Sequence, residues 1–267
     1  MINTLILVVP VIVTATKMFD WIASHENPLV RPSEKVSIMM PTFNEERYIK
    51  MSLESLKNQT IVSRFPESFE IIVADGISED STPDIANEYA RVIQVKEKGI
   101  LTARAVCIKE SRGQIIVSVN ADTYYPKTWL QNVLYHFKYP EVVGVTTPRL
   151  YFMEYDGKVS EHPANIPMKL WRPVERYMYG SNSAFLKDAY YITGGFNLNV
   201  NQLNSEELQP EEEIYFRDRL QKVGKVVFEY SPVFTAFRRV GKCWFNPKDT
   251  FCREIEEGRR FRGIRNE

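Results

Sequence analysis

The sequence has no excess of charge of either sign. Lys and Arg together number 34, and Asp and Glu also number 34, so the formal net charge is zero. Proteins that bind nucleic acid gain affinity by neutralising phosphates, and this composition gives no support to that class. We therefore expect no nucleic-acid partner. The rest of the composition, with 44% hydrophobic and 25% charged residues, is ordinary for a globular protein.

Cysteine and histidine are also scarce. There are three of each, and neither set has the spacing of a zinc site or of a disulfide framework. The cysteines fit a reducing compartment, where they serve as small apolar residues. The sequence contains no GxxxxGK[ST] loop, so it gives no sign of a P-loop nucleotide site.

Long hydrophobic runs are limited to the start of the chain. Residues 1–16 contain no charged side chain, but the run is shorter than the roughly 20 residues that a membrane-spanning helix needs. Neither a basic region nor a clear cleavage site is present, so a removed signal peptide is not expected. A short membrane anchor, an interfacial helix and a segment packed on the domain stay open, and we favour membrane attachment. We assign residues 1–20 to this apolar segment and residues 21–35 to a linker.

From residue 36 onward, short apolar runs alternate with helical patterns. The predicted strands are 36–40, 70–75, 92–95, 115–120 and 142–147, and the helices between them are 44–59, one that begins at 82, 101–111 and 128–137. This alternation predicts an α/β fold, Rossmann-like, with a mostly parallel central sheet flanked by helices. Asn44 is expected to cap the first helix, with Glu45 and Glu46 in its first turn. After residue 150 the regularity weakens, and we expect a turn at 194–196, helices at 214–223 and 249–262, and strands at 226–228 and 233–237.

Polar residues stand where several of these strands end. Because the carboxyl ends of parallel strands meet at one edge of the sheet, where ligands of α/β proteins bind, we expect Pro41, Asp75 and Asp122 to lie together. Asn120 and Asp122 would share one side of an extended segment. A carboxylate there can bind Mg²⁺ or Mn²⁺ that holds a diphosphate, and Asn120 suits a hydrogen bond to ribose. Alternatively, Asp122 caps the helix that follows.

Other residues can complete a nucleotide site. Asp75 can accept the imino N–H of uracil or guanine, Glu45 can contact the nucleoside, and Arg104 suits a diphosphate. The simpler alternatives are a turn cap for Asp75, a first-turn acid for Glu45 and a solvated helix position for Arg104. A later helix opens with three acids, one of which can take a proton from an acceptor hydroxyl, although the helix dipole alone also favours acids there. These acids are Glu211, Glu212 and Glu213.

The order of these features resembles that of the family 2 glycosyltransferases, inverting enzymes of the GT-A fold that use nucleotide-diphosphate sugars. The resemblance covers roughly residues 36–230. Its landmarks are Pro41-Thr42-Phe43-Asn44-Glu45-Glu46, Asp75-Gly76 with Asp80, Gly99 with Arg104, Asn120-Ala121-Asp122, Gly194-Gly195-Phe196-Asn197, and Glu212-Glu213 ahead of Arg219-Leu220. The chain has no Gln-x-x-Arg-Trp signature and no set of membrane spans, which argues against a processive polymer synthase.

The resemblance implies a role for each landmark. Glu213 takes the position of the usual catalytic Asp, with Glu212 as a second candidate base, and Asp122 is the metal ligand. The chain departs from the family pattern at Asn120, which replaces the first Asp of Asp-x-Asp, and at Ala105, where Asn is usual; the His that often follows the base helix is absent. The residues implied in nucleotide binding are Pro41, Thr42, Glu45, Asp75, Arg104 and Asn120. Those on the acceptor side are Gly194, Gly195 and Trp171.

The expected function is a metal-dependent, inverting transfer of a sugar from a nucleotide-diphosphate sugar to a hydroxyl acceptor that is a glycan, a lipid or linked to protein. The cofactor would be Mn²⁺ or Mg²⁺, and the nucleotide UDP or GDP. A sugar nucleotidyltransferase and a non-catalytic, membrane-tethered binding protein are the alternatives. Residues 36–125 would form the nucleotide-binding half and 126–240 the acceptor half, followed by a basic amphipathic helix in 241–267. We expect the protein to be membrane-associated, with its catalytic domain facing the cytoplasm.

Overall fold

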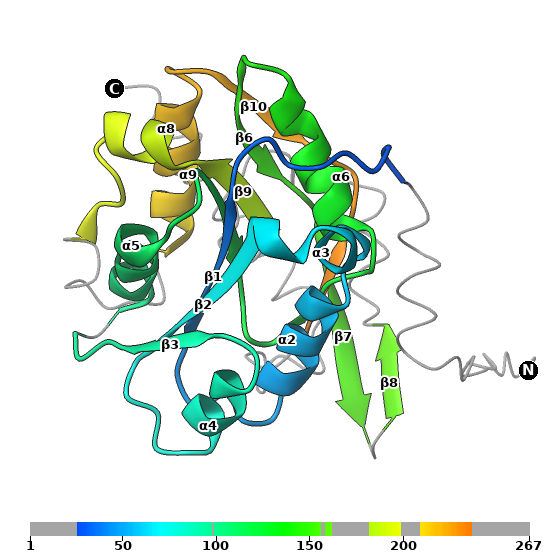
Figure 1. The fold of residues 1–267 in the computed structure, drawn as a ribbon. Coiled ribbons are helices and arrows are strands. Elements are labelled where there is room, and N and C mark those ends of the chain that lie inside the picture. The colour runs from blue at the N-terminus through cyan, green and yellow to red at the C-terminus, as the bar shows by residue number, and fades with distance from the viewer. Residues whose placement is uncertain (1–25, 98, 156–157, 162–181, 199–208, 237–267) are drawn as a thin grey trace, which may run out of the picture.

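The computed structural model describes residues 26–97, 99–155, 158–161, 182–198 and 209–236 (Figure 1). The apolar start of the chain, Trp171 and the helix expected at 249–262 lie outside these residues. In the part of the chain that is described, no helix combines the length and the hydropathy needed to cross a bilayer.

A seven-stranded sheet forms the centre of the molecule, in the order β10-β6-β9-β4-β1-β2-β3. Its neighbouring strands are parallel, except that β9 is antiparallel to both β4 and β6. The prediction of an α/β fold with a mostly parallel sheet is confirmed, and the first five predicted strands correspond to β1, β2, β3, β4 and β6. The strands are β1 (Val36–Thr42), β2 (Phe69–Asp75), β3 (Arg91–Gln94), β4 (Ile115–Val119), β6 (Val142–Thr146), β9 (Asn182–Leu186) and β10 (Lys225–Phe228).

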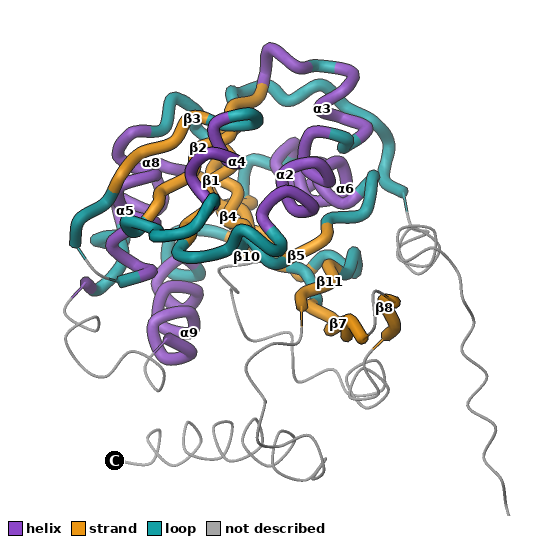
Figure 2. Tube along the Cα trace, turned by 90° about the horizontal axis from the view of Figure 1, so that it is seen from below, coloured by secondary structure: helices purple, strands orange, loops and turns teal. Residues whose placement is uncertain are grey.

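Helices cover both faces of this sheet (Figure 2). Side chains along a strand alternate between faces, so Ile38 and Met40 of β1 belong to one core and Met39 to the other. The first core is shared with α2 (Ile49–Lys57), α3 (Thr60–Arg64), α4 (Thr82–Asn87) and α6 (Trp129–Tyr135). The second is shared with α5 (Ile100–Glu110), α8 (Lys187–Ile192) and α9 (Gln209–Leu220). Short 3-10 helices lie at Pro66–Ser68 and His136–Lys138.

A smaller sheet, in the order β5-β11-β7-β8, adjoins the end of β4. It consists of β5 (Thr123–Tyr124), β7 (Arg149–Tyr155), β8 (Lys158–Glu161) and β11 (Val233–Ala236). Its apolar core contains Tyr124, Phe152 and Phe234, and Tyr48 just ahead of α2 packs against it. Because β5 starts directly after Asp122, that residue lies at the junction of the two sheets.

The first helix begins later than its sequence predicts. α2 starts at Ile49 and has no acid in its first turn, so the expectation that Asn44 caps it, with Glu45 and Glu46 in the first turn, was wrong. Asn44 instead adopts a left-handed conformation with φ of 52°, and its side-chain oxygen accepts the Glu79 N–H at 2.9 Å. A contact with a distant loop therefore replaces the local cap.

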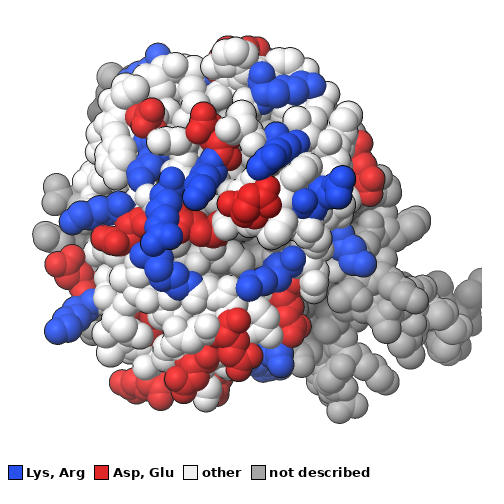
Figure 3. All heavy atoms as spheres, viewed as in Figure 1, with Lys and Arg blue, Asp and Glu red and all other residues white. Residues whose placement is uncertain are grey.

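Charges are mixed over the surface. On the face shown in Figure 3, basic and acidic side chains are interspersed over most of the area, and acidic side chains gather along the lower edge, where α4 lies in Figure 1. This distribution agrees with the zero net charge of the sequence.

Candidate active site

The carboxyl ends of β1, β2 and β4 form one edge of the main sheet. Thr42, the last residue of β1, pairs with Asp75, the last residue of β2. On the other side of β1, Met39 pairs with Ser118, so Asn120 follows at the same edge, one residue beyond β4. The structure therefore brings Thr42, Asp75 and Asn120 together from separate parts of the chain, as a parallel sheet requires.

Asp75 is fully buried. One of its carboxylate oxygens accepts the Ser78 hydroxyl at 2.5 Å and the other accepts the Ser78 N–H at 3.0 Å. This is the turn-capping role that the sequence left open as an alternative. A carboxylate accepts up to about four hydrogen bonds, so these contacts leave acceptor capacity, and recognition of a base by Asp75 stays a prediction.

The loops after β1 and β2 are locked to each other. The Asn44 N–H donates to the Ser78 hydroxyl at 2.9 Å, and the Glu45 N–H donates to the Thr82 hydroxyl at 2.7 Å. Asp80 accepts from the N–H groups of Thr82 and Glu46. Burial acts to raise the pKa of Asp80, but a hydrogen bond from the Thr82 hydroxyl, together with these backbone bonds, outweighs it and holds the pKa below its ordinary value.

The two joined loops after β1 and β2 expose two apolar side chains to solvent. Phe43 is 58% exposed and Ile77 is 46% exposed, and Ile77 is held at a positive φ of 62°. The Phe43 ring lies beside Gly76, where a Cβ would come 3.6 Å from ring atom Cδ2. An exposed aromatic at the sheet edge is suited to stacking on a flat ring. Sequence reasoning did not single out Phe43 as a candidate site residue because an aromatic beside a strand also fits a core position.

The side-chain hydroxyl of Thr42 is a buried polar group at the same edge. Its side chain is 7% exposed, and its hydroxyl oxygen is buried with no hydrogen-bond partner in the part of the chain that is described. Buried polar atoms normally have a partner. Pro41 and Thr42 thus place an unsatisfied hydroxyl at the edge where a nucleotide is predicted.

Arg104 and Asn120 are in contact. A guanidinium nitrogen of Arg104 donates to the Asn120 side-chain oxygen at 3.5 Å, and Arg104 is only 4% exposed. The sequence alternative of a solvated Arg104 is therefore wrong. Helix α5 begins after Gly99, whose φ of 125° suits glycine. An arginine keeps its charge when buried, so this contact places a positive charge against the end of β4.

Asp122 is half-buried. Its backbone carbonyl accepts the Ala236 N–H at 2.9 Å, and its carboxylate accepts the Thr123 hydroxyl at 3.3 Å. Within the described ranges, no cluster of three or more His, Cys, Asp or Glu side chains could hold a metal ion. Asp122 thus offers a single carboxylate to a cation, two residues after Asn120.

The turn at Gly194 and Gly195 ends α8, which covers the same face of the main sheet as α5 and α9. Gly194 and Gly195 have φ of 84° and 70°, and their N–H groups donate to the carbonyls of Tyr191 and Tyr190. Phe196 then packs against Phe216 of α9, with ring centroids 4.9 Å apart. The sequence prediction of a tight turn here is confirmed.

Arg219 of α9 binds this turn directly. Its guanidinium donates to the Gly195 carbonyl at 2.7 Å and lies over the Phe216 ring. Phe216 also contacts Phe185, which pairs with Ile116 in the middle of the sheet. Helix α9 is therefore docked through Phe216 and Arg219, together with the fully buried Leu220.

The direction of α9 shows toward which edge of the sheet its acidic first turns extend. The helix leads into β10, which runs parallel to β6, so its end at Leu220 lies near the amino edge of the sheet. From there it passes Phe216 at mid-sheet, and its first turns extend toward the carboxyl edge, since a 12-residue helix is roughly 18 Å long. The backbone of Glu212 and Glu213 belongs to these turns. Their side chains, like Trp171, lie outside what the structure describes.

The fold and this edge define a protein of the GT-A class, and comparisons with solved structures agree. The mannosyltransferase PcManGT from Pyrobaculum calidifontis, in complex with GDP-Man and Mn²⁺, matches with a TM-score of 0.63 and 17% identity over 85% of this chain and 66% of that chain. Residues 1–349 of Staphylococcus aureus TarS in complex with UDP-GlcNAc match with a TM-score of 0.56 and 20% identity, covering 77% of this chain and 59% of that chain.

The chain belongs to glycosyl transferase family 2, whose model matches residues 37–241. The putative glycosyltransferase EpsH of Bacillus subtilis (strain 168) is 33% identical over 105 residues, which are 37% of this chain and 29% of EpsH. The poly(ribitol-phosphate) beta-N-acetylglucosaminyltransferase TarS of Staphylococcus aureus is 32% identical over 106 residues, or 37% of this chain and 18% of TarS. The matched segments thus span less than a third of these relatives.

Proposed function

We propose that this chain is an inverting glycosyltransferase that moves a sugar from a nucleoside-diphosphate sugar to a hydroxyl acceptor. The observation that carries the proposal is the contact of buried Arg104 with Asn120 at the carboxyl edge, two residues before Asp122, in a chain of this family. A buried guanidinium suits a diphosphate, and the half-buried Asp122 carboxylate just beyond the same strand suits the cation that arrives with it.

The nucleoside would lie over the locked loops after β1 and β2. Phe43 offers a ring face for the base, and the buried Thr42 hydroxyl offers a polar partner. Asp75 would select a base with an imino N–H, which favours UDP or GDP. The solved relatives that carry UDP-GlcNAc or GDP-Man support a donor of this kind.

Asp122 fits a metal that is shared with the substrate. Mg²⁺ is commonly held by one or two carboxylates together with substrate phosphates and water. Asp122 supplies one such carboxylate. Mn²⁺ or Mg²⁺ bound there would neutralise charge that develops on the departing diphosphate.

The remaining steps fall to side chains of this chain. Arg104 stabilises the diphosphate as the bond to the anomeric carbon breaks. Glu213, or its neighbour Glu212, takes the proton from the acceptor hydroxyl, whose oxygen forms the new bond from the opposite face of the sugar. The electron pair of the broken bond leaves with the diphosphate, and the configuration at the anomeric carbon inverts.

The test is release of nucleotide from a panel of UDP-, GDP- and dTDP-sugars with Mn²⁺. We expect nucleoside diphosphate from at least one donor, and a loss of about 10²- to 10⁴-fold in kcat for Glu213→Gln or, if Glu212 is the base, for Glu212→Gln. Asp122→Asn should also lose activity, while Asp188→Asn, an exposed acid on α8, should not. Pyrophosphate release would show a nucleotidyltransferase instead, and no release at all would favour a binding protein.

A further inference from the structure

Helix α2 and the residues just beyond it present a row of buried polar side chains. Ser52, Ser55 and Gln59 are spaced three and four residues apart and are 0%, 7% and 0% exposed. This spacing keeps them on one side of the helical segment. Buried polar groups are costly unless they are hydrogen-bonded, so the partners of this row indicate why it is polar.

All three side chains bond to the backbone of one segment, residues 121–130. The Ser52 hydroxyl lies 2.7 Å from the carbonyl oxygens of Ala121 and of Thr123, and it accepts the Thr123 N–H at 3.0 Å. These contacts fall on the residues immediately before and after Asp122. Ser52 therefore holds the backbone on both sides of the proposed metal ligand.

The other two members hold the same segment further along. The Ser55 hydroxyl accepts the Tyr125 N–H at 3.2 Å. The Gln59 amide donates to the carbonyls of Tyr125 and Pro126 at 2.9 and 2.8 Å, and its oxygen accepts the Leu130 N–H at 2.9 Å. The segment that leaves β4 is thus fixed from Ala121 to the first turn of α6.

We propose that Ser52 is a positioning residue for Asp122: it sets the backbone that aims this carboxylate at the cation and diphosphate. The inference rests on the proposed function, because it assumes that Asp122 binds the metal. Hydrogen-bonding partners that orient a metal ligand commonly contribute 10- to 100-fold to metal affinity or activity. A hydroxyl that only stabilised the fold would change neither quantity.

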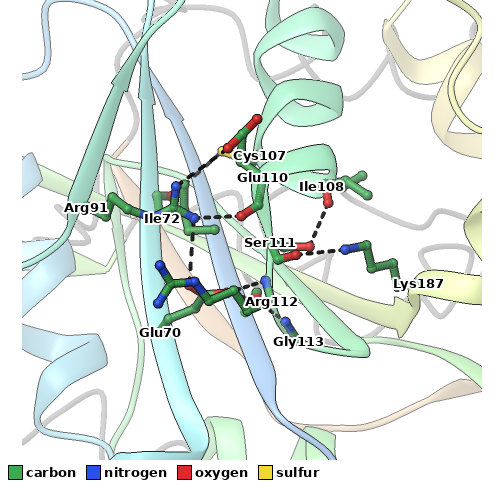
Figure 4. Close-up of polar contacts among 11 residues, drawn as sticks. Glu70, Ile72, Arg91, Cys107, Ile108, Glu110, Ser111, Arg112, Gly113 and Lys187 are labelled. Carbon is green, nitrogen blue, oxygen red and sulfur yellow. Dashed lines mark hydrogen bonds and ion pairs between the residues drawn. The ribbon is translucent and has the colours of Figure 1, made fainter.

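Ser111 provides the matched control. Ser111 is also buried, at 7% exposure, and its hydroxyl donates to the Ile108 carbonyl at 2.6 Å (Figure 4). The Lys187 ammonium donates to the backbone carbonyl of Ser111. It lies at the opposite edge of the sheet, where the following residues Gly113 and Gln114 bond to the start of β1. Ser52→Ala and Ser111→Ala therefore each remove one buried hydroxyl, at opposite edges.

The experiment compares the two variants in the full chain. Mn²⁺ affinity is measured in the presence of UDP from the electron paramagnetic resonance signal of free Mn²⁺, together with UDP affinity without metal and thermal stability. We expect both variants to melt earlier, but only Ser52→Ala to lose about 10- to 100-fold in Mn²⁺ affinity, with UDP affinity in the absence of metal unchanged. Equal Mn²⁺ affinity in the two variants overturns the inference.

Two further outcomes are distinguishable. If the unaltered chain binds UDP but no Mn²⁺, the metal-dependent function fails before Ser52 is tested. If Ser52→Ala does not fold, Ser55→Ala takes its place, because the Ser55 hydroxyl holds Tyr125, three residues from Asp122. A several-fold loss of Mn²⁺ affinity in that variant supports the row as a positioning device, and an unchanged affinity contradicts it.

Discussion

The two glycines of the turn after α8 offer a sharp test, because they share a backbone conformation but not their surroundings. Gly194 has φ of +84° and no atom within 4 Å of the place where a Cβ would stand. Gly195 has φ of +70°, and a Cβ there would come within 2.9 Å of Tyr190 Cζ and 3.0 Å of its hydroxyl oxygen. Alanine at each position therefore separates the cost of the backbone from the cost of the contact.

The expected magnitudes follow from these contacts. A left-handed conformation costs a non-glycine residue about 1–2 kcal/mol, and Gly194→Ala should lose this amount alone. Tyr190 is only 6% exposed and its ring packs against Phe196 and Phe216. Overpacking of such a core costs about 1–3 kcal/mol, so Gly195→Ala should lose about 2–5 kcal/mol in all.

Equilibrium unfolding in urea measures both variants against the unaltered chain. Gly194→Asn serves as a further control, since asparagine tolerates the left-handed region better than alanine and should lose less. Equal destabilisation by Gly194→Ala and Gly195→Ala would refute the reasoning, because it would mean that Tyr190 moves aside without cost.

Two other predictions concern the buried thiol and the start of the chain. Burial raises the pKa of Cys107 to about 12 from its ordinary 9.0. In a variant with Cys243→Ser and Cys252→Ser, the Cys107 thiol should therefore resist a disulfide reagent at pH 8 while the chain is folded and react only when it unfolds. Because the folded state keeps this proton longer than the unfolded state, Cys107 should also make stability fall as pH rises from about 9 toward 12, and Cys107→Ala should remove that part of the fall. We further expect the full chain to float with anionic liposomes, whereas a chain that begins at Glu26 should not, because it lacks the apolar run. The shortened chain keeps the Asn27 bonds to Asn132 and Glu229. Equal flotation of the two chains would contradict attachment through the apolar run.

The sheet could be predicted from the sequence because each of its parallel strands is an apolar run bounded by turn residues. The end of β2 at Asp75 and the end of β4 just before Asn120 are clear in the sequence, and the topology then brings those ends together. What failed was the start of α2. Asn44, Glu45 and Glu46 fit a helix start and a loop equally well, and the contacts that decide between them come from a loop more than thirty residues away.

The antiparallel strand β9 had no signal of its own. Asn182–Leu186 is short, and its place depends on pairing with both β4 and β6. The role of Ser52 was hidden for a related reason. A serine within a helix has no distinctive pattern, and only its contacts with Ala121 and Thr123 show what it holds.

Two landmarks that the sequence separates are one contact in the structure. The Gly-Gly-Phe turn and the Arg-Leu pair of α9 meet where Arg219 binds Gly195 and Phe216 packs on Phe196. Neither motif shows this contact on its own, because the two residues lie 24 positions apart in the chain and only the fold brings the Arg219 guanidinium to the Gly195 carbonyl.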